Sequence, residues 1–307
     1  MSTPPIVAVV GPTASGKTDL SLDLADRLDG EIVNTDAMAV YRGMDIGTAK
    51  PAVAARRGVP HHLLDLLDPD QPLTVAEFQG WARTAIAAIR GRGRTPILVG
   101  GSALYTRAIL DRFEFPGTDP EVRRRLEAEL AATGPAALHT RLRERDPVAA
   151  EQIRPDNGRR IVRALEIVEI TGRSFTATLP RLEYVDPLTL QVGVEIDRPT
   201  LDSRIEERVA TMFEAGLVDE VRGLLPGLAE GRTAREAIGY KQVLAHLRGE
   251  ITLAEARDQT VRATRRFARR QGSWFGKDPR IVWAPYDARD RAELAMAAVS
   301  EMLSSAL

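Results

Sequence analysis

Short apolar runs alternate with amphipathic stretches over much of the chain. The runs at 6–10, 31–34, 95–99 and 190–196 are rich in Val and Ile and predict strands, the last of which returns to the same sheet. Helical spacing of apolar positions at 19–28 and 75–90 predicts helices between them. Strands that alternate with helices favour an α/β fold, in which helices wrap a parallel sheet.

The pattern changes between about residues 115 and 186. A Pro- and Gly-containing stretch at 116–120 predicts a linker and a helix cap, and residues 121–132 predict a charged helix. The segment is rich in Arg and has no convincing strand pattern. It therefore predicts an all-helical insertion, residues 115–186, in a core formed by 1–114 and 187–307, whose last part is mostly helical.

The first predicted strand leads into a glycine-rich loop. Its sequence is Gly11-Pro12-Thr13-Ala14-Ser15-Gly16-Lys17-Thr18, which matches the pattern Gly, four residues, Gly-Lys-Thr. The glycines allow backbone N–H groups to point at a phosphate, and the following helix presents its positive end to the same anion. Lys17 adds a point charge, and the Thr18 hydroxyl can bind Mg²⁺. The loop predicts a phosphate site in a P-loop NTPase-like fold.

Two features of the predicted sheet edge bear on the ligand. The strand at 97–99 ends in Gly100-Gly101, so the carboxylate with which a typical nucleoside triphosphatase holds magnesium is missing, which disfavours a motor or switch protein. Asp36 ends the second strand, where parallel sheets bind ligands, and could accept a proton from a nucleophile. It could equally cap the turn that follows, and small-molecule kinases also place an Asp here.

A strongly basic helix is predicted late in the chain. From 257 to 280, eight Arg and Lys residues against two Asp give a local charge of +6. Five arginines share one helical face, namely Arg262, Arg265, Arg266, Arg269 and Arg270. Because these charges repel one another unless anions neutralise them, the stripe favours a contact with a nucleic-acid backbone over a solvated face. The nearby Trp274 and Phe275 are expected to anchor the helix in the core.

Other charged or loop-like segments are less specific. Arg159, Arg160 and Arg163 form a second basic cluster in the insertion. Arg204 and Arg208 lie one helical turn apart, and a long Arg that reaches the P-loop could neutralise a leaving phosphate. Taken alone, the stretches 41–51 and 59–65 favour ordinary surface loops.

Composition narrows the class of protein. The chain has 307 residues and a net charge of −1 from 42 basic and 43 acidic residues, so total charge says nothing about nucleic acid. The absence of Cys excludes disulfides, zinc–thiolate sites and cysteine nucleophiles, and four His residues make a metal cage unexpected. The first apolar run is too short for a signal peptide or a membrane span, so we expect a cytoplasmic protein that contacts no membrane.

In order along the chain, these segments resemble the tRNA dimethylallyltransferases, also called tRNA isopentenyl transferases. The resemblance covers nearly the whole chain. Besides the P-loop, it rests on 41–51 (YRGMDIGTAKP), 60–65 (PHHLLD), 100–105 (GGSALY), 163–166 (RALE), 238–242 (IGYKQ) and 269–271 (RRQ) with Trp274 and Phe275. Of these, the segment 41–51 is nearly diagnostic.

The resemblance implies an activity and the residues that carry it. Such enzymes transfer the dimethylallyl group from its diphosphate to N6 of adenine 37, beside the anticodon of tRNA. Asp36 would be the general base or hydrogen-bond acceptor for the attacking amine, and Arg208 would stabilise the departing diphosphate. Residues 11–18 would hold the diphosphate with Mg²⁺, through Lys17 and Thr18, while Thr13 helps to position it. We also expect a monomer.

The resemblance further implies a tRNA-contacting set, in which the helical insertion clamps the anticodon stem-loop. The set comprises Asp36, Ala37, Met38, Ala39, Ser102, Arg123, Arg159, Arg160, Ile161, Val162, Arg163, Ala237, Ile238, Gly239, Tyr240, Lys241 and Gln242. Four positions depart from the family pattern. Ala37 and Ala39 replace the family's Ser and Gln, which removes two polar side chains near the adenine. Ser102 replaces a usual Thr, and Lys241 replaces a usual Arg.

Three other functions fit parts of the sequence. A small-molecule kinase would bind ATP at the P-loop and use Asp36 as base. A prenyltransferase could act on free adenine nucleotides, and a non-catalytic protein could bind RNA in a nucleotide-dependent way. The basic helix and insertion disfavour the first two, since neither needs an extended polyanion surface, and the missing carboxylate after Val99 disfavours the third.

Overall fold

The computed structural model describes residues 3–113, 115–175 and 182–305. The chain divides into two compact units. The core unit comprises Met1–Leu110 and Tyr184–Leu307, and the insertion unit comprises Asp111–Glu183. Each unit is described separately below.

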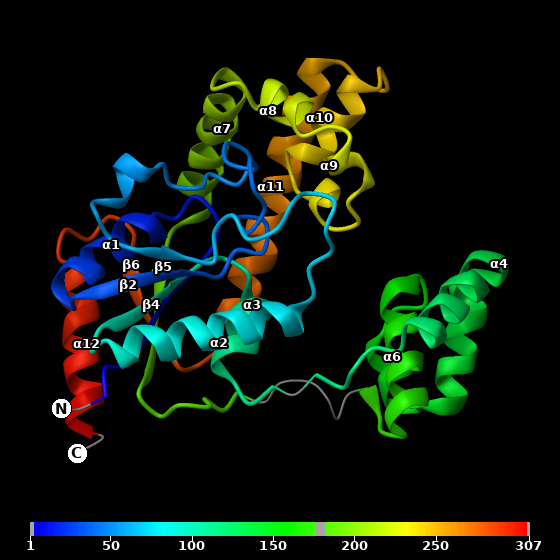
Figure 1. Ribbon diagram of the computed structural model, residues 1–307, viewed down its shortest axis with the longest axis horizontal. Helices are drawn as coiled ribbons and strands as arrows, with labels where there is room; N and C mark the ends of the chain where they lie inside the picture. Colours follow the sequence, from blue (N-terminus) through cyan, green and yellow to red (C-terminus); the bar gives the residue numbers. More distant parts are fainter. Residues whose placement is uncertain (1–2, 114, 176–181, 306–307) are drawn as a thin grey trace. The chain divides into compact units, whose positions relative to one another are not determined.

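One parallel sheet organises the core unit (Figure 1). Its six strands lie in the order β3-β2-β4-β1-β5-β6. Their bounds are β1 Ile6–Val10, β2 Gly30–Asn34, β3 His61–His62, β4 Thr95–Val99, β5 Thr189–Glu195 and β6 Ile281–Pro285. All paired strands are parallel, with Val9 level with both Val99 and Val192, which confirms the predicted fold class.

Alternate residues of the central strands pack against helices on opposite faces of the sheet. Val7 and Val9 share a core cluster with Leu20 of α1 (Lys17–Arg27) and Val299 of α12 (Arg291–Ser305). On the other face, Ala8 and Val10 pack in a cluster with Phe78 of α2 (Val75–Gly91) and Ile109 of α3 (Ala103–Leu110). This alternation fixes the strand register and aligns the carboxyl ends of the strands at one edge.

The remaining helices of the core unit lie beyond that edge, except that the last of them runs back past α3 (Figure 1). They are α7 Arg198–Glu214, α8 Leu217–Gly223, α9 Gly227–Glu230, α10 Tyr240–Leu247 and α11 Leu253–Phe275, with 3₁₀ turns at Val53–Arg56 and Ala234–Glu236. A capping box between Thr252 and Glu255 starts α11. Ala268 of α11 packs with Ile205 and Val209 of α7, which holds these two long helices together.

The insertion unit is a small helical cluster. Its helices are α4 Pro120–Arg145, α5 Pro147–Gln152 and α6 Gly158–Thr171. Asp119 caps α4, and Gly134, at φ 79°, interrupts it before Pro135. Leu126, Leu142 and Ile161 are among the residues that form its own hydrophobic core. The insertion unit begins and ends a few residues earlier in the chain than the predicted boundaries at 115 and 186.

Two strands are missing from the sequence prediction. β3 contains two residues, too few to show a pattern. β6 lies in the stretch predicted to be mostly helical; it is an edge strand in which Val282 and Trp283 are exposed and Pro285 ends the run, so it lacks the apolar signal of the central strands. Across the described parts of the chain, no helix is long and apolar enough to cross a bilayer.

Candidate active site

The P-loop connects β1 to α1 in the conformation that its glycines permit. Gly11 and Gly16 adopt φ values of 136° and 96°, and a Cβ on Gly11 would lie 3.2 Å from the carbonyl oxygen of Val194. Gly16 precedes α1 without a side-chain cap, which leaves the first-turn amides available to an anion. Lys17 curls back so that its Nζ donates to the carbonyl oxygen of Pro12 at 2.6 Å.

Asp36 is held at the carboxyl end of β2 by the side chain of Asn34. The Asn34 amide accepts from the Asp36 N–H at 2.9 Å and donates to the carbonyl oxygens of Asp36 and Leu63 at 2.8 and 3.0 Å. One carboxylate oxygen of Asp36 accepts from the Met38 N–H at 2.9 Å. Asp36 therefore caps a turn and also lines the cavity described next, so the two readings of this residue are compatible.

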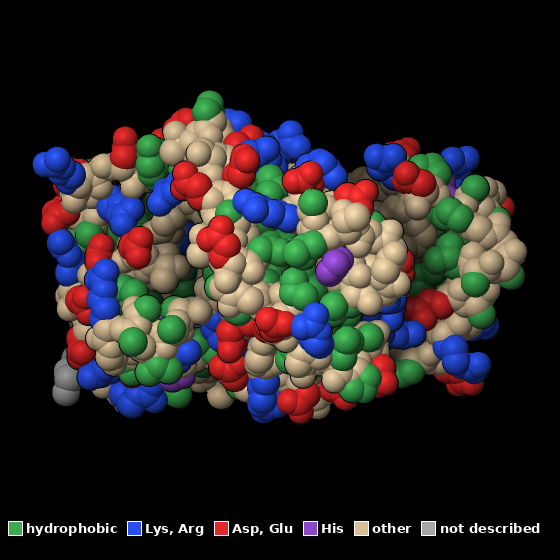
Figure 2. All heavy atoms as spheres, turned by 90° about the horizontal axis from the view of Figure 1, so that it is seen from above, with side chains coloured by type: hydrophobic (Ala, Val, Ile, Leu, Met, Phe, Trp, Pro, Cys, Tyr) green, Lys and Arg blue, Asp and Glu red, His purple; other side chains and the backbone are tan. Residues whose placement is uncertain are grey.

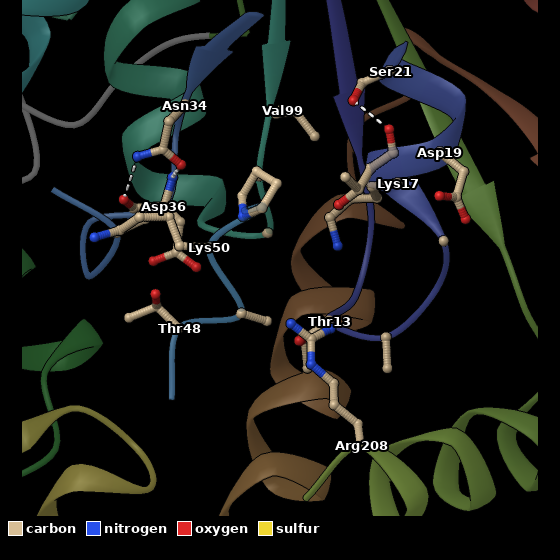
Figure 3. Close-up of a pocket in the computed structure, with 18 of the residues that line it drawn as sticks. Thr13, Lys17, Asp19, Ser21, Asn34, Asp36, Thr48, Lys50, Val99 and Arg208 are labelled. Carbon is tan, nitrogen blue, oxygen red and sulfur yellow. Dashed lines mark hydrogen bonds between the residues drawn. The ribbon is translucent and has the colours of Figure 1, made fainter. Parts of the chain in front are cut away.

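The P-loop and Asp36 line one cavity of about 500 Å³ at the carboxyl edge of the sheet. Its wall is completed by residues 48–51, by Gly100 and Gly101 after β4, by Arg204 and Arg208 of α7, and by Phe267 and Gln271 of α11. Figure 3 shows Asp36 on one side of the opening and Lys17, Thr13 and Arg208 on the other, while Asp19 points away. The four residues predicted to be catalytic thus share one cavity.

The charges of this cavity perturb one another. The pKa of Lys17 is lowered from 10.5 to about 7, mainly by burial and also by the nearby Arg208, while Asp36 opposes the shift. Burial raises the pKa of Asp36, against the Met38 N–H and the cations of Lys17 and Arg208. Burial also lowers the pKa of Arg208. Two cations facing one carboxylate in a poorly hydrated space leave an excess of positive charge that an anionic ligand would relieve.

The segment 41–51 is held by buried contacts and its residues 48–51 form part of the cavity wall, so its interpretation as an ordinary surface loop is wrong. The Glu220 carboxylate accepts from the N–H groups of Asp45, Ile46 and Gly47 at 3.1, 2.7 and 3.3 Å. It also accepts from the Tyr240 hydroxyl at 2.5 Å. The Tyr240 ring packs so closely on Gly47 that a Cβ there would lie 2.4 Å from a ring carbon.

Lys50 joins this wall to the segment 59–65. Its side chain is almost fully buried, and its Nζ lies 2.6 Å from carboxylate oxygens of both Asp45 and Asp65. The same Nζ donates to the carbonyl oxygen of Tyr41 at 2.9 Å. His61 and Leu64 also line the cavity, so 59–65 is part of the site as well.

The predicted tRNA contacts of the core unit differ in what they expose. Ala37, Ala39, Ala237 and Tyr240 are buried, and the Tyr240 hydroxyl is committed to Glu220. The side chain of Gln242 accepts from the Gly239 N–H at 2.8 Å and so caps α10. Met38, Ser102 and Ile238 are half-buried. Lys241 is exposed, and its ammonium group pairs with the Glu236 carboxylate at 2.6 Å.

The predicted contacts of the insertion unit also fall into two classes. Arg123 and Arg163 both bind the fully buried carboxylate of Glu166, and Arg163 donates to the carbonyl oxygens of Pro116 and Gly117 at 2.8 and 3.2 Å. Ile161 and Val162 lie in the hydrophobic core, where their side chains are shielded from solvent. Arg159 and Arg160 are exposed, with the guanidinium of Arg160 over the Phe175 ring.

Helix α11 presents most of its predicted arginine stripe to solvent. Arg262, Arg266, Arg269 and Arg270 are exposed, and within the described residues none of the four has an ion pair. Arg265 instead binds Glu206 at 2.8 Å. Elsewhere acidic and basic side chains are interspersed, as Figure 2 shows for the face that it presents. The four arginines therefore form a stripe of unpaired positive charge along one side of α11.

The aromatic residues near the end of α11 behave differently from one another. Phe275 is buried as predicted, but Trp274 is 52% exposed, so its interpretation as a core anchor is wrong. The two residues are adjacent on a helix and therefore point in different directions. Phe267, one helical turn before Gln271, lines the cavity.

Sequence reasoning did not single out three polar residues that shape the site. Asn34 holds Asp36, Glu220 holds the segment 45–47, and Gln271 contacts the P-loop. The only signal for Gln271 was its place in the RRQ segment. Asn34 and Glu220 had none, because most of their partners are backbone groups, and every residue type carries the same backbone groups.

Comparison with known proteins gives consistent matches. A model of the family described as IPP transferase matches residues 39–278. A tRNA dimethylallyltransferase of Nocardioides sp. is 71% identical over 300 residues, 97% of each chain, and one of Streptomyces coelicolor is 60% identical over 298 residues, 97% of this chain and 95% of the relative.

Solved structures agree with these sequence matches. The tRNA isopentenylpyrophosphate transferase of Bacillus halodurans is similar with a TM-score of 0.73 and 39% identity, over 99% of both chains. A eukaryotic dimethylallyltransferase described as acting on tRNA has a TM-score of 0.83 and 26% identity, over 98% of this chain and 80% of the other.

Proposed function

The chain belongs to the IPP transferase family of tRNA-modifying prenyltransferases, and we propose that it transfers the dimethylallyl group of dimethylallyl diphosphate to N6 of adenine 37 of tRNA. The observation that carries this assignment is the cavity in which Asp36 faces Lys17, Thr13 and Arg208. It pairs a phosphate-binding loop with a single carboxylate placed to take up a proton.

The diphosphate would bind at the start of α1. The open first-turn amides, Lys17 and Arg208 supply hydrogen-bond donors and positive charge, and bound diphosphate would restore the charge of Lys17 that burial disfavours. When the carbon–oxygen bond breaks, negative charge grows on the leaving diphosphate. The same donors stabilise it without having to reorganise, which lowers the barrier.

The donor set also fits magnesium held together with the substrate. Mg²⁺ prefers oxygen ligands, keeps several waters and commonly binds substrate phosphates with few protein ligands. Thr18 is exposed at the cavity and offers a hydroxyl, and the described residues contain no cluster of three or more His, Asp or Glu that would hold the ion alone. Bound Mg²⁺ would neutralise charge on the diphosphate.

The transfer itself needs one base. The lone pair of the adenine N6 forms a bond to C1 of the dimethylallyl group as the bond from C1 to the diphosphate oxygen breaks, and the diphosphate leaves with that electron pair. One N6 proton passes to the Asp36 carboxylate. Burial raises the pKa of Asp36 and makes it a stronger base than an exposed carboxylate, while the Met38 N–H fixes its direction. The walls of the cavity limit the access of water to the reacting carbon.

Recognition of tRNA would use both units. An adenine must leave its stack before its amine can enter an enclosed site, and the exposed arginines of α11 supply contacts for the RNA backbone. In the insertion unit, Arg159 and Arg160 offer similar contacts. Because the side chains at 37 and 39 are buried methyl groups, we expect backbone groups and Met38 to contact the adenine there. We further expect a monomer in the cytoplasm.

A small-molecule kinase with this fold is disfavoured. The relatives named above, which match over nearly the whole chain, are tRNA dimethylallyltransferases, and β4 ends without the metal-binding carboxylate of a typical nucleoside triphosphatase.

Transfer of label tests the proposal. The protein is incubated with Mg²⁺, dimethylallyl diphosphate labelled in its prenyl group, and either unmodified tRNA or AMP. We expect label in tRNA and none in AMP. Label in AMP but not in tRNA, or in neither, would contradict the proposal.

A further inference from the structure

Gln271 is a buried polar residue of α11 whose side chain ends at the P-loop. It is 5% exposed, while its neighbours Arg269 and Arg270 face solvent. Its Oε1 accepts from the Thr13 N–H at 2.9 Å, and its Nε2 donates to the carbonyl oxygen of Gly101 at 2.8 Å. The orientation of the amide is fixed, because a backbone N–H can only donate and a carbonyl can only accept.

The close approach of Gly101 shows that this contact is built into the fold. A Cβ on Gly101 would lie 2.2 Å from Nε2 of Gln271, which no side chain tolerates without displacement. Gly101 has no positive φ that would by itself require glycine. The glycine therefore makes room for the Gln271 amide, which joins the loop after β4 to the P-loop.

We propose that Gln271 is a positioning residue that fixes the Thr13 peptide of the P-loop for diphosphate binding. Because its N–H donates to Gln271, the Thr13 peptide cannot rotate into the cavity. The diphosphate is then bound by the backbone N–H groups at the start of α1. The link also makes α11, which carries the exposed arginine stripe, part of the framework of the P-loop. The inference rests on the proposed function for the identity of the donor substrate.

The test compares substitutions at both ends of the contact. Gln271→Met removes both hydrogen bonds at similar volume, and Gly101→Ala displaces the same amide from the other side. The control is Gln259→Met, a half-buried Gln on the same helix outside the cavity. The measurements are the Kd for inorganic pyrophosphate with Mg²⁺, the Kd for unmodified tRNA, and KM and kcat for dimethylallyl diphosphate.

We expect Gln271→Met to raise the pyrophosphate Kd and the KM about tenfold, as the loss of a buried hydrogen bond does, with the tRNA Kd within about twofold of wild type. Gly101→Ala should raise the pyrophosphate Kd at least as much, because its Cβ would also lie 3.2 Å from the carbonyl oxygen of Gly11. In the Gly101→Ala background, Gln271→Met should raise that Kd little further, because the contact is already broken.

Three results would overturn the proposal. The first is that Gln271→Met binds pyrophosphate as tightly as Gln259→Met does, and the second is that the increases in pyrophosphate Kd of the two single variants multiply in the double variant. The third is that Gln271→Met loses affinity for tRNA to the same extent as for pyrophosphate, which would mean that α11 is displaced. If Gly101→Ala does not fold, the comparison of pyrophosphate with tRNA affinity in Gln271→Met decides alone. Pyrophosphate binding does not depend on transfer, so a wild-type protein that transfers nothing to tRNA refutes the proposed function and leaves this test intact.

Discussion

Replacement of Glu220 by Ala should destabilise the core unit and weaken the donor site. The carboxylate accepts from the N–H groups of Asp45, Ile46 and Gly47 and from the hydroxyl of the fully buried Tyr240. In Glu220→Ala the hydroxyl loses its acceptor inside the core, which costs about 1–3 kcal/mol. The loop N–H groups can turn to water and add less, so we expect a loss of about 2–4 kcal/mol in the free energy of unfolding.

The neighbouring residue provides the control. Asp219 precedes Glu220 on α8, is 79% exposed and pairs only with Arg222 among the described residues. Asp219→Ala should cost at most about 1 kcal/mol, since the ion pair is exposed and the charge lies near the start of a helix. Urea unfolding of the two variants measures the difference.

The kinetic consequence separates the role of the loop from general stability. Residues 48–51 line the cavity directly after the backbone that Glu220 holds, so Glu220→Ala should also raise the KM for dimethylallyl diphosphate under conditions where the protein remains folded. Tyr240→Phe removes the buried hydroxyl. In that background the additional cost of Glu220→Ala should shrink by about 1–3 kcal/mol. Equal stability of the Glu220→Ala and Asp219→Ala variants would refute the reasoning.

Three further predictions concern chemistry and charge. Asp36→Asn should lower kcat by about 10²- to 10⁴-fold in single-turnover assays and leave the affinity for tRNA within a few fold of wild type. If tRNA binding is lost while the bound complex turns over normally, Asp36 is a positioning residue and not the base. Because the pKa of Lys17 is about 7 in the free protein, Lys17 is mostly neutral at pH 8, and pyrophosphate binding there should take up a proton, whereas at pH 6 it should not. Calorimetry in buffers of different ionisation enthalpy measures this uptake, and a Lys17→Met variant that takes up as many protons would contradict it. Removal of Arg262 and Arg266 together should reduce the slope of log K against log salt for tRNA by about 1.5 to 2 with pyrophosphate affinity unchanged; an unchanged slope would place these arginines outside the interface.

The central part of the fold was predictable because each central strand is an apolar run bounded by turns. The P-loop was predictable because its function lies in consecutive residues, which a sequence displays directly. β6 was not, since an edge strand with exposed Val282 and Trp283 carries little apolar pattern. The predicted end of the first insertion helix near 132 agrees with the structure, because Gly134 has non-helical backbone angles and the stretch of α4 from Pro135 to Arg145 is a second helix beyond that break.

The site shows the same division between local and long-range information. Asp36 could be placed at a strand end, but not its position opposite Arg208, which depends on where α7 packs. Arg123 and Arg163 looked like free basic residues. Only the fold shows that the buried Glu166 binds them both. Partners distant in the sequence leave no mark in its local pattern.

The position of the product on tRNA tests the central claim most directly. Unmodified tRNA is treated with the protein, Mg²⁺ and dimethylallyl diphosphate, digested with a base-specific ribonuclease, and analysed by mass spectrometry alongside the same tRNA with guanine at position 37. The account predicts a dimethylallyl group on the fragment that contains adenine 37, and no modification of the guanine variant. Modification at another position, equal modification of both tRNAs, or an unmodified adenine 37 would contradict it.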